Sequence, residues 1–255
     1  MLKAERQQLV YSICAENGST SVKDISEQLG VSEMTARRDL TELAAAGKVV
    51  RIHGGARMPG ESGGIKLSRV LTHAEKSQEH IDKKRVAARL AAERVCEGDS
   101  IFLGGGTTVE CMVDYLPTRN IRVVTSSMPV FSALAKREYP EIYLTGGVYS
   151  RSTEILKPID SASSVRSLAC DKAFVGATGV FQNEIFGSDP QVVCLLRSVL
   201  DNSRKRYLLI DSHKVGRRDF FSFYPLARFD TVFCDPQISL KRRHSIDEHT
   251  LLVTE

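Results

Sequence analysis

Beyond Gly98, short apolar runs alternate with stretches of helical spacing, and this alternation constrains the fold more than any other feature of the chain. The apolar runs cover residues 100–103, 121–124, 142–144, 173–175, 207–210 and 232–234, and the helical stretches cover residues 109–116, 128–137, 155–167 and 191–203. Short buried strands that alternate with helices form a mostly parallel sheet covered on both faces. The sequence therefore predicts an α/β domain.

Glycines and hydroxyl side chains follow most of these strands. Because the carboxyl ends of parallel strands meet at one edge of a sheet, we expect these residues to form a crevice. Inward-pointing amides, hydroxyl donors and a helix start are typical of a phosphate site, although the spacing matches neither a Walker loop nor a dinucleotide fingerprint. We predict a pocket for a small polyhydroxylated anion, with these effector-binding candidates: Gly105, Gly106, Thr107, Thr108, Thr125, Ser126, Gly146, Gly147, Lys157, Gly179, Asp211 and Lys214.

Each charged candidate has a plainer alternative. Lys214 would neutralise the anion, or it is a solvated surface lysine. Asp211 would bind a sugar hydroxyl, or it caps the following turn. Lys157 would clamp the ligand together with Asp160, or it belongs to an ordinary loop. The six histidines have no metal-ligand spacing and the six cysteines form no C-x-x-C pair. We therefore assign no metal and no catalytic residue, and we expect free thiols.

The first 57 residues carry the pattern of three helices and a basic glycine-containing strand pair. We expect helices over residues 4–17, from Ser21 to the break at Gly30, and over residues 32–46, where Ser32 is in the N-cap position. Short strands are expected around residues 49–52, followed by the glycines of the segment 53–57. This order is typical of a winged helix-turn-helix that binds DNA.

Basic residues are concentrated in this region. Between Met34 and Gly60 there are five lysines and arginines against two acidic residues, whereas the net charge of the whole chain is only +4. Such local charge is typical of phosphate contact. Two arginines on a helix would by themselves indicate only a solvent-exposed face. Because a basic strand pair follows them in the sequence, we expect the arginines to contact DNA. The DNA-binding candidates are Ser32, Met34, Thr35, Arg37, Arg38, Lys48, Arg51 and His53.

The composition changes between these two parts. Residues 58–64 are rich in glycine and proline, as linkers are, and a polar helix-prone segment follows from Leu71 and merges into residues 82–95. We predict a winged helix-turn-helix domain over residues 1–57, a connecting segment over 58–80, and an effector-binding and oligomerisation domain over 81–255. No apolar run approaches the ~20 residues that span a bilayer. The N-terminus also lacks a signal peptide's apolar core, so we expect a cytoplasmic chain with no membrane partner.

The segment Val31-Ser32-Glu33-Met34-Thr35-Ala36-Arg37-Arg38-Asp39-Leu40, together with Arg51-Ile52-His53-Gly54-Gly55-Ala56, resembles the signature of the DeoR family of bacterial transcriptional regulators. The resemblance continues through residues 82–87, 106–108, 146–147, 176–179 and 211–216. It implies a sensor domain related in fold to ribose-5-phosphate isomerases and CoA transferases. It also implies a phosphorylated sugar as effector and repression of a carbohydrate-catabolic operon.

Three residues depart from the family pattern. Ala36 stands where isoleucine is usual, Gly104 where an acidic residue is usual, and Ser126 where asparagine is common. The last two positions concern contacts with the ligand. Residues 155–160 resemble a segment of the family's deoxyribonucleoside-responsive member, which points to a pentose phosphate such as deoxyribose 5-phosphate.

We therefore predict a homo-oligomeric repressor of a carbohydrate or nucleoside catabolic operon that binds double-stranded operator DNA and is released by a small phosphorylated sugar, without a cofactor. Two alternatives remain. One is a sugar-phosphate isomerase-like enzyme with an appended DNA-binding domain, which would need a carboxylate base such as Asp211 or Asp189 in the pocket. The other is an architectural DNA-binding protein whose α/β half only oligomerises.

Overall fold

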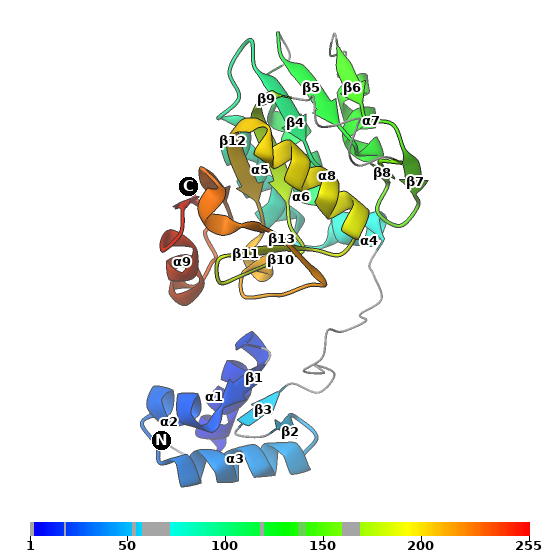
Figure 1. Cartoon of the computed structure of the whole chain (residues 1–255). Helices are drawn as coiled ribbons and strands as arrows, with labels where there is room; N and C mark the ends of the chain where they lie inside the picture. The colour runs from blue at the N-terminus through cyan, green and yellow to red at the C-terminus, as the bar shows by residue number, and fades with distance from the viewer. Residues whose placement is uncertain are drawn as a thin grey trace. The chain divides into compact units, whose positions relative to one another are not determined.

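The structure, a computed structural model, describes residues 3–17, 19–52, 55–57, 72–117, 120–137, 139, 141–159 and 169–255. The chain divides into two compact units, Met1–Ser68 and Arg69–Glu255, and each is described by itself (Figure 1). Among the described residues, no helix is long and apolar enough to cross a membrane.

The first unit is a helix-turn-helix with a small sheet. Its helices are α1 (Lys3–Asn17), α2 (Val22–Leu29) and α3 (Glu33–Ala45), and its strands β1 (Ser19–Ser21), β2 (Val50–Ile52) and β3 (Gly55–Arg57) pair antiparallel in the order β1-β3-β2. Ser21 caps α2 through a capping box, and Gly30 ends it in the left-handed conformation with φ 62°. These boundaries confirm the helices expected from the sequence.

A buried ion pair joins α1 to α3. Asp39 is 1% exposed, and its Oδ2 accepts a hydrogen bond from Arg6 Nε at 2.6 Å while its Oδ1 accepts one from Arg6 Nη2 at 3.2 Å. Apolar side chains from all three helices surround the pair, including Val10, Ile25 and Leu40. Asp39 is therefore part of the packing between helices, not of the exposed face that carries the arginines.

A parallel sheet forms the centre of the second unit. Its strands are β4 (Ser100–Leu103), β5 (Arg122–Thr125), β6 (Ile142–Leu144), β9 (Cys170–Gly176), β12 (Ser203–Leu209), β14 (Thr231–Phe233) and β15 (Leu251–Val253). They lie in the order β15-β14-β12-β9-β4-β5-β6, and every neighbouring pair is parallel. The predicted parallel α/β domain is confirmed, and all six predicted strands are present.

Apolar side chains alternate along the strands between the two faces of this sheet. Ile101 and Leu103 face the core formed with α5 (Ile81–Ala92), α6 (Thr107–Met112) and α7 (Met128–Lys136). Phe102 faces the opposite core, which α8 (Pro190–Asp201) covers. Helices therefore lie on both faces, as Figure 1 shows. This two-sided burial explains why the strands are continuously apolar in the sequence.

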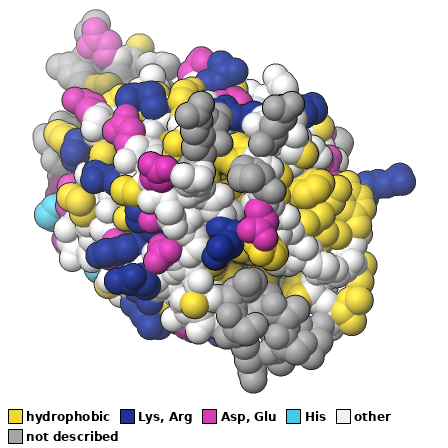
Figure 2. Space-filling view, turned by 90° about the horizontal axis from the view of Figure 1, so that it is seen from above, with side chains coloured by type: hydrophobic (Ala, Val, Ile, Leu, Met, Phe, Trp, Pro, Cys, Tyr) yellow, Lys and Arg dark blue, Asp and Glu magenta, His cyan; other side chains and the backbone are white. Residues whose placement is uncertain are grey.

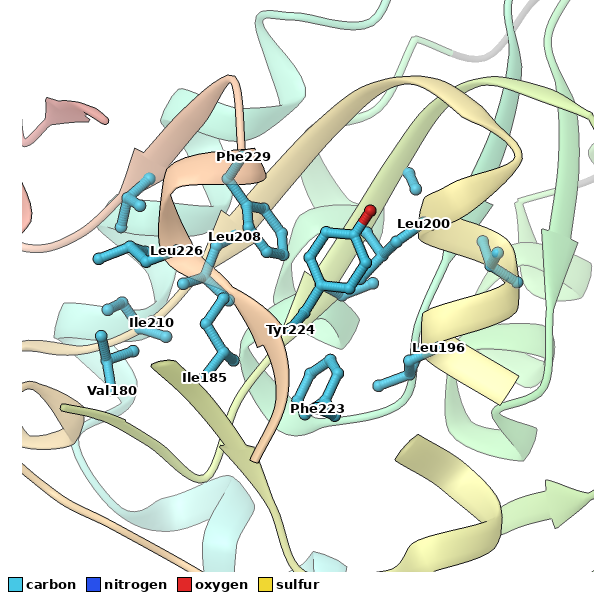
Figure 3. Packing of buried hydrophobic residues seen from close by; sticks show 14 of the residues in the cluster. Val180, Ile185, Leu196, Leu200, Leu208, Ile210, Phe223, Tyr224, Leu226 and Phe229 are labelled. Atoms are coloured by element: carbon cyan, nitrogen blue, oxygen red, sulfur yellow. The ribbon is translucent and has the colours of Figure 1, made fainter. Parts of the chain in front are cut away.

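A smaller antiparallel sheet lies beside α8. It contains β10 (Gly179–Phe181), β11 (Glu184–Gly187) and β13 (Phe221–Pro225). In Figure 3, Leu196 and Leu200 of α8 lie beside the rings of Phe223 and Tyr224 of β13. The Tyr224 hydroxyl also donates to Asp201 Oδ1 at 2.9 Å. This sheet closes the outer side of the core that α8 covers.

Two expectations about helices are wrong in part. Residues 155–167 were expected to be helical, but Ile155–Lys157 forms strand β8, which pairs antiparallel with β7 (Val148–Ser150). Residues 71–95 were expected to form one merged helix, but the structure has α4 (His73–Gln78) and then α5, separated at His80, whose φ of 52° is left-handed. A residue in that conformation cannot continue a right-handed helix.

Candidate functional site

The exposed face of α3 carries the first group of candidate residues. Ser32 caps the helix, since its Oγ accepts a hydrogen bond from Thr35 N at 3.3 Å. Met34 is 76% exposed. Arg37 pairs with Glu33 at 3.1 Å and Arg38 with Glu42 at 3.5 Å, each across one helical turn. Pairs this exposed are weak, so a phosphate or a base edge can displace the carboxylates.

The wing carries the remaining DNA-binding candidates. Lys48 and Arg51 are exposed at the start of the β2–β3 hairpin, whereas His53 lies outside the described residues. Gly55 lies so close to the Thr20 carbonyl that a Cβ there would overlap it. Glycine is therefore needed where the hairpin packs against β1.

The second unit contains a cavity of about 160 Å³ at the carboxyl ends of its three central strands. Gly105 and Gly106 follow β4, Gly176 ends β9, and Asp211 follows β12. A single water occupies roughly 10–15 Å³ by the same kind of measure, so the cavity has room for a small metabolite. This location agrees with the rule that ligands bind at the carboxyl ends of parallel strands.

Three lysines from different elements line this cavity. Lys76 belongs to α4, Lys84 to α5, and Lys214 to η2 (Ser212–Lys214). Lys84 is only 4% exposed, and its ammonium donates to the backbone carbonyl of Lys76. In the part of the chain that the structure describes, none of the three forms an ion pair with a carboxylate. Burial lowers the pKa of Lys76 and of Lys84, and the charge of Lys214 lowers both further. The charge of Asp211 opposes this shift at Lys84, and those of Asp219 and Glu79 oppose it at Lys76.

Asp211 and two histidines line the cavity beside the lysines. Asp211 is 1% exposed; its Oδ1 accepts a hydrogen bond from His213 N at 3.0 Å, while its buried Oδ2 has no hydrogen-bond partner among the described residues. The rings of His80 and His213 are stacked with centroids 3.7 Å apart. Burial, Lys83 and His80 lower the pKa of His213. The site thus offers ammonium groups for an anion and a free carboxylate oxygen for a hydroxyl.

Several predicted effector residues line the cavity, and the loop geometry explains two of the glycines. The residues at the cavity are Gly105, Gly106, Thr107, Thr108, Asp211 and Lys214. Gly106 has φ 119°, which L side chains rarely adopt, and a Cβ on Gly105 would overlap the Ile155 side chain. Gly104 is buried against Phe174, whose carbonyl accepts its N–H at 2.9 Å.

The other predicted residues lie outside the cavity lining, because the β7–β8 hairpin covers the end of β5. Leu156 N donates to the Ser126 carbonyl, and Thr125 Oγ1 donates to the Leu103 carbonyl within the sheet. Lys157 pairs with Asp189, which does line the cavity. The remaining three are Gly146 and Gly147, between β6 and β7, and Gly179, at the start of β10.

Sequence analysis missed most of the basic residues of the cavity. His73, Lys76, His80, Lys84 and Arg217 all line it. Lys76, His80 and Lys84 are spaced four residues apart, and this spacing is the sequence signal that places them on one face of a helix. On an otherwise polar helical segment, however, such a row also fits a solvated face.

The cysteines and metal-binding groups add no further site. Cys14, Cys170 and Cys234 are buried, and burial raises the pKa of Cys170 to about 11. Such thiols are poor nucleophiles. Across the described ranges of the chain, no group of three or more histidine, cysteine or acidic side chains is placed to hold a metal ion.

The chain was compared with solved structures. It is similar to ribose 5-phosphate isomerase A from Neisseria gonorrhoeae, with 21% identity and a TM-score of 0.37 over 51% of this chain and 52% of that one. It is also similar to eIF2B delta from Chaetomium thermophilum, with 17% identity and a TM-score of 0.45 over 62% of this chain and 57% of that one. At these scores the likeness supports no inference about activity.

Comparisons of sequence identify the family. Residues 6–61 match the DeoR-like helix-turn-helix domain, and residues 79–236 match the DeoR C terminal sensor domain. The chain is 36% identical to a lactose phosphotransferase system repressor from Streptococcus mutans, over 93% of this chain and 94% of the relative. It is 32% identical to a repressor of the same name from Staphylococcus epidermidis, over the full length of both. These relatives are named as repressors and not as enzymes. The chain therefore belongs to the DeoR family of DNA-binding transcriptional regulators.

Proposed function

We propose that this protein represses a carbohydrate or nucleoside catabolic operon, and that a phosphorylated sugar bound in the cavity of the second unit releases it from operator DNA. The observation that carries the proposal is the convergence of Lys76, Lys84 and Lys214 on one cavity without a paired carboxylate among the described residues. Lys84 is buried and Lys76 and Lys214 are half-buried, and ammonium groups withdrawn from water are costly unless an anion neutralises them. A phosphate group supplies that charge.

The neighbouring Asp211 favours a sugar phosphate over inorganic phosphate. Its Oδ2 is buried without a hydrogen-bond partner in the described structure, and a ligand hydroxyl would donate to it. Both relatives are named lactose phosphotransferase system repressors. This name refers to a sugar and to the transfer of a phosphoryl group, which agrees with a sugar phosphate as ligand. The departure at Gly104 removes an acidic side chain from the strand end, so Asp211 is the carboxylate that we assign to the sugar hydroxyls.

On the DNA side, we propose that Ser32, Met34, Thr35, Arg37 and Arg38 of the α3 region contact the major groove and that Lys48, Arg51 and His53 contact the backbone beside it. The exposure of the α3 side chains and the weakness of their ion pairs support these roles. A recognition helix presents its N-terminal residues to base edges in this motif.

The test combines operator binding with a ligand panel. An operator duplex is selected from random-sequence DNA with the full chain, and its affinity is titrated with pentose and hexose phosphates and with the same sugars unphosphorylated. We expect at least one sugar phosphate to lower the affinity by about tenfold or more. The Lys84→Met variant should lose this response, while Lys241→Met, at an exposed lysine of α9 (Leu240–Asp247), should retain it. If no phosphorylated sugar changes operator affinity, the effector proposal is wrong.

Self-association stays a prediction that we carry forward as a proposal. Strand β6 is an edge of the described sheet, and Tyr143, Val148 and Tyr149 beside it are 46%, 58% and 50% exposed. In the space-filling view of Figure 2, hydrophobic side chains gather in one area of the face that is seen. An exposed edge strand can pair with a second copy. Light scattering should give the mass of an oligomer for the wild type and a smaller mass for Tyr143→Lys.

A further inference from the structure

Helix α4 is the first element that the structure describes after residues 58–71, which connect it in sequence to the DNA-binding unit. Thr72 caps it through a capping box with Glu75. It has six residues, none of them buried. A helix this short depends on outside contacts for its stability, so it belongs to the elements that move most easily.

Two sets of contacts hold α4, one at its first residue and one at the Lys76 carbonyl, which accepts a hydrogen bond from Lys84 of α5. His73 N donates to the Ser152 carbonyl at 3.0 Å, and His73 Nε2 lies 2.9 Å from Glu110 Oε2. Further along, the helix contributes Lys76 to the cavity, and Glu79 and His80 follow it in the cavity wall. Helix α4 is therefore held at its first residue and at the Lys76 carbonyl, and the Lys76 side chain lines the proposed anion site.

Like charges oppose α4 across that site. Lys76 on α4 faces the charge of Lys214 on η2, and burial adds to the cost of keeping Lys76 protonated. The charge of Lys214 also acts on Lys84, the neighbour whose ammonium contacts the Lys76 carbonyl. A phosphate between these groups would replace repulsion by attraction, and the attraction is strong where water is partly excluded.

We propose that Lys76 draws α4 closed over the bound phosphate group, so that this helix conveys the occupancy of the cavity to the segment leading to the DNA-binding unit. The inference rests on the proposed effector site. A ligand can shift a conformational equilibrium only through contacts that differ between the two states. Lys76 supplies such a contact, because it lies on the short helix α4, whereas Lys84 lies on α5, which packs against β12 and β14 of the sheet.

Hydrogen–deuterium exchange on the full chain tests the closure, with inorganic phosphate as probe and chloride at equal ionic strength as reference. Phosphate should slow exchange at residues 105–108 and 211–214, which reports binding, and also at residues 73–78, which reports closure, each by about tenfold. In Lys76→Met the slowing at 73–78 should disappear while that at 211–214 persists. The matched control Lys241→Met should behave as the wild type.

Operator affinity provides the second readout, taken as the ratio of affinities without and with phosphate at a concentration that saturates residues 211–214. This ratio should fall to about one in Lys76→Met. If 211–214 are protected but 73–78 exchange as before, or if Lys76→Met keeps the wild-type ratio, the closure proposal is wrong and the effector site stands. If neither inorganic phosphate nor any sugar phosphate of the panel protects either segment, both proposals are wrong.

Discussion

A buried charge in the first unit and one in the second have different surroundings. Asp39 in the first unit is 1% exposed and is neutralised by Arg6, with two hydrogen bonds between the side chains. Lys84 in the second unit is 4% exposed, and its ammonium contacts only a backbone carbonyl in the described structure. The carboxylate of Asp39 is neutralised by a direct ion pair, whereas Lys84 has no direct ion pair among the described residues and lies within the influence of the Asp211 charge.

This difference separates a structural charge from a functional one. Removing one partner of a satisfied pair leaves an uncompensated charge inside the protein, so stability falls. Removing a buried charge that has no partner removes the desolvation cost of that charge, so the free energy of unfolding rises. Any ligand that the charge binds is then bound more weakly. Burial alone therefore does not identify a functional lysine or aspartate; the missing partner does.

The largest expected effect is on the satisfied pair. Asp39→Ala should lower the free energy of unfolding of the first unit, because Arg6 loses its partner between α1 and α3. Thermal unfolding followed by circular dichroism measures this change. Glu33→Ala is the matched control, since Glu33 is an exposed carboxylate on the same helix whose partner Arg37 also belongs to α3, and it should change stability little. Equal effects of the two substitutions would contradict the structural role of Asp39.

The exposed arginines of α3 provide the next effect. Arg38→Ala should weaken operator binding by about tenfold and reduce its salt dependence by about one unit of slope. Arg89→Ala is the control, because Arg89 forms the same kind of exposed pair, with Glu93 on α5 in the other unit. Fluorescence anisotropy at several salt concentrations measures both. An equal loss in Arg89→Ala would mean that general charge, and not α3, determines affinity.

The unsatisfied lysine should give an effect of opposite sign to that of Asp39. Lys84→Met should raise the free energy of unfolding of the second unit by about 1 kcal/mol, since a buried ammonium is replaced by an apolar chain of similar length. Chemical denaturation measures the change in the absence of phosphate. A clear loss of stability would show that Lys84 stabilises the fold. It would contradict the difference that we infer between Lys84 and Asp39.

The smallest effect concerns the anchor of α4. The contact with Glu110 raises the pKa of His73 above its ordinary value near 6.5, against the smaller opposing effect of burial. Its stabilisation is therefore fully present below pH 6.5 and is lost as the pH rises through the raised pKa. Wild type should exceed His73→Gln in stability by about 0.5 kcal/mol at pH 6, and the difference should shrink towards pH 9. A difference that does not depend on pH would contradict the ion pair.

The sequence predicted the parts of the fold that depend on local pattern. Ser32 and Gly30 mark the boundaries of α3 and α2, and the short apolar runs mark the strands of the parallel sheet. The spacing over residues 155–167 predicts a helix, but Ile155–Lys157 forms strand β8. These residues are extended because they pair with β7, and a pairing of this kind depends on tertiary contacts that the local pattern does not contain.

The candidate site was predicted at its glycines and at Lys214 but missed at Lys76 and Lys84, for a physical reason. A glycine turn after a strand is a local feature, and Gly105 and Gly106 were found in this way. Lys76 and Lys84 are functional candidates only because α4 and α5 bring them to the ends of strands that follow later in the sequence. The buried pair between Arg6 and Asp39 was missed for the same reason, since its members lie 33 residues apart.

The order of strands in the large sheet also bears on how a newly made chain matures. The central pairing joins β4 to β9, with Ile101 opposite Lys172, so the middle of the sheet cannot form until a long stretch of chain has followed β4. Contacts between distant residues form slowly, whereas the first unit is small, largely helical and synthesised first. We expect each nascent chain to gain the shape that binds DNA before it can respond to a metabolite.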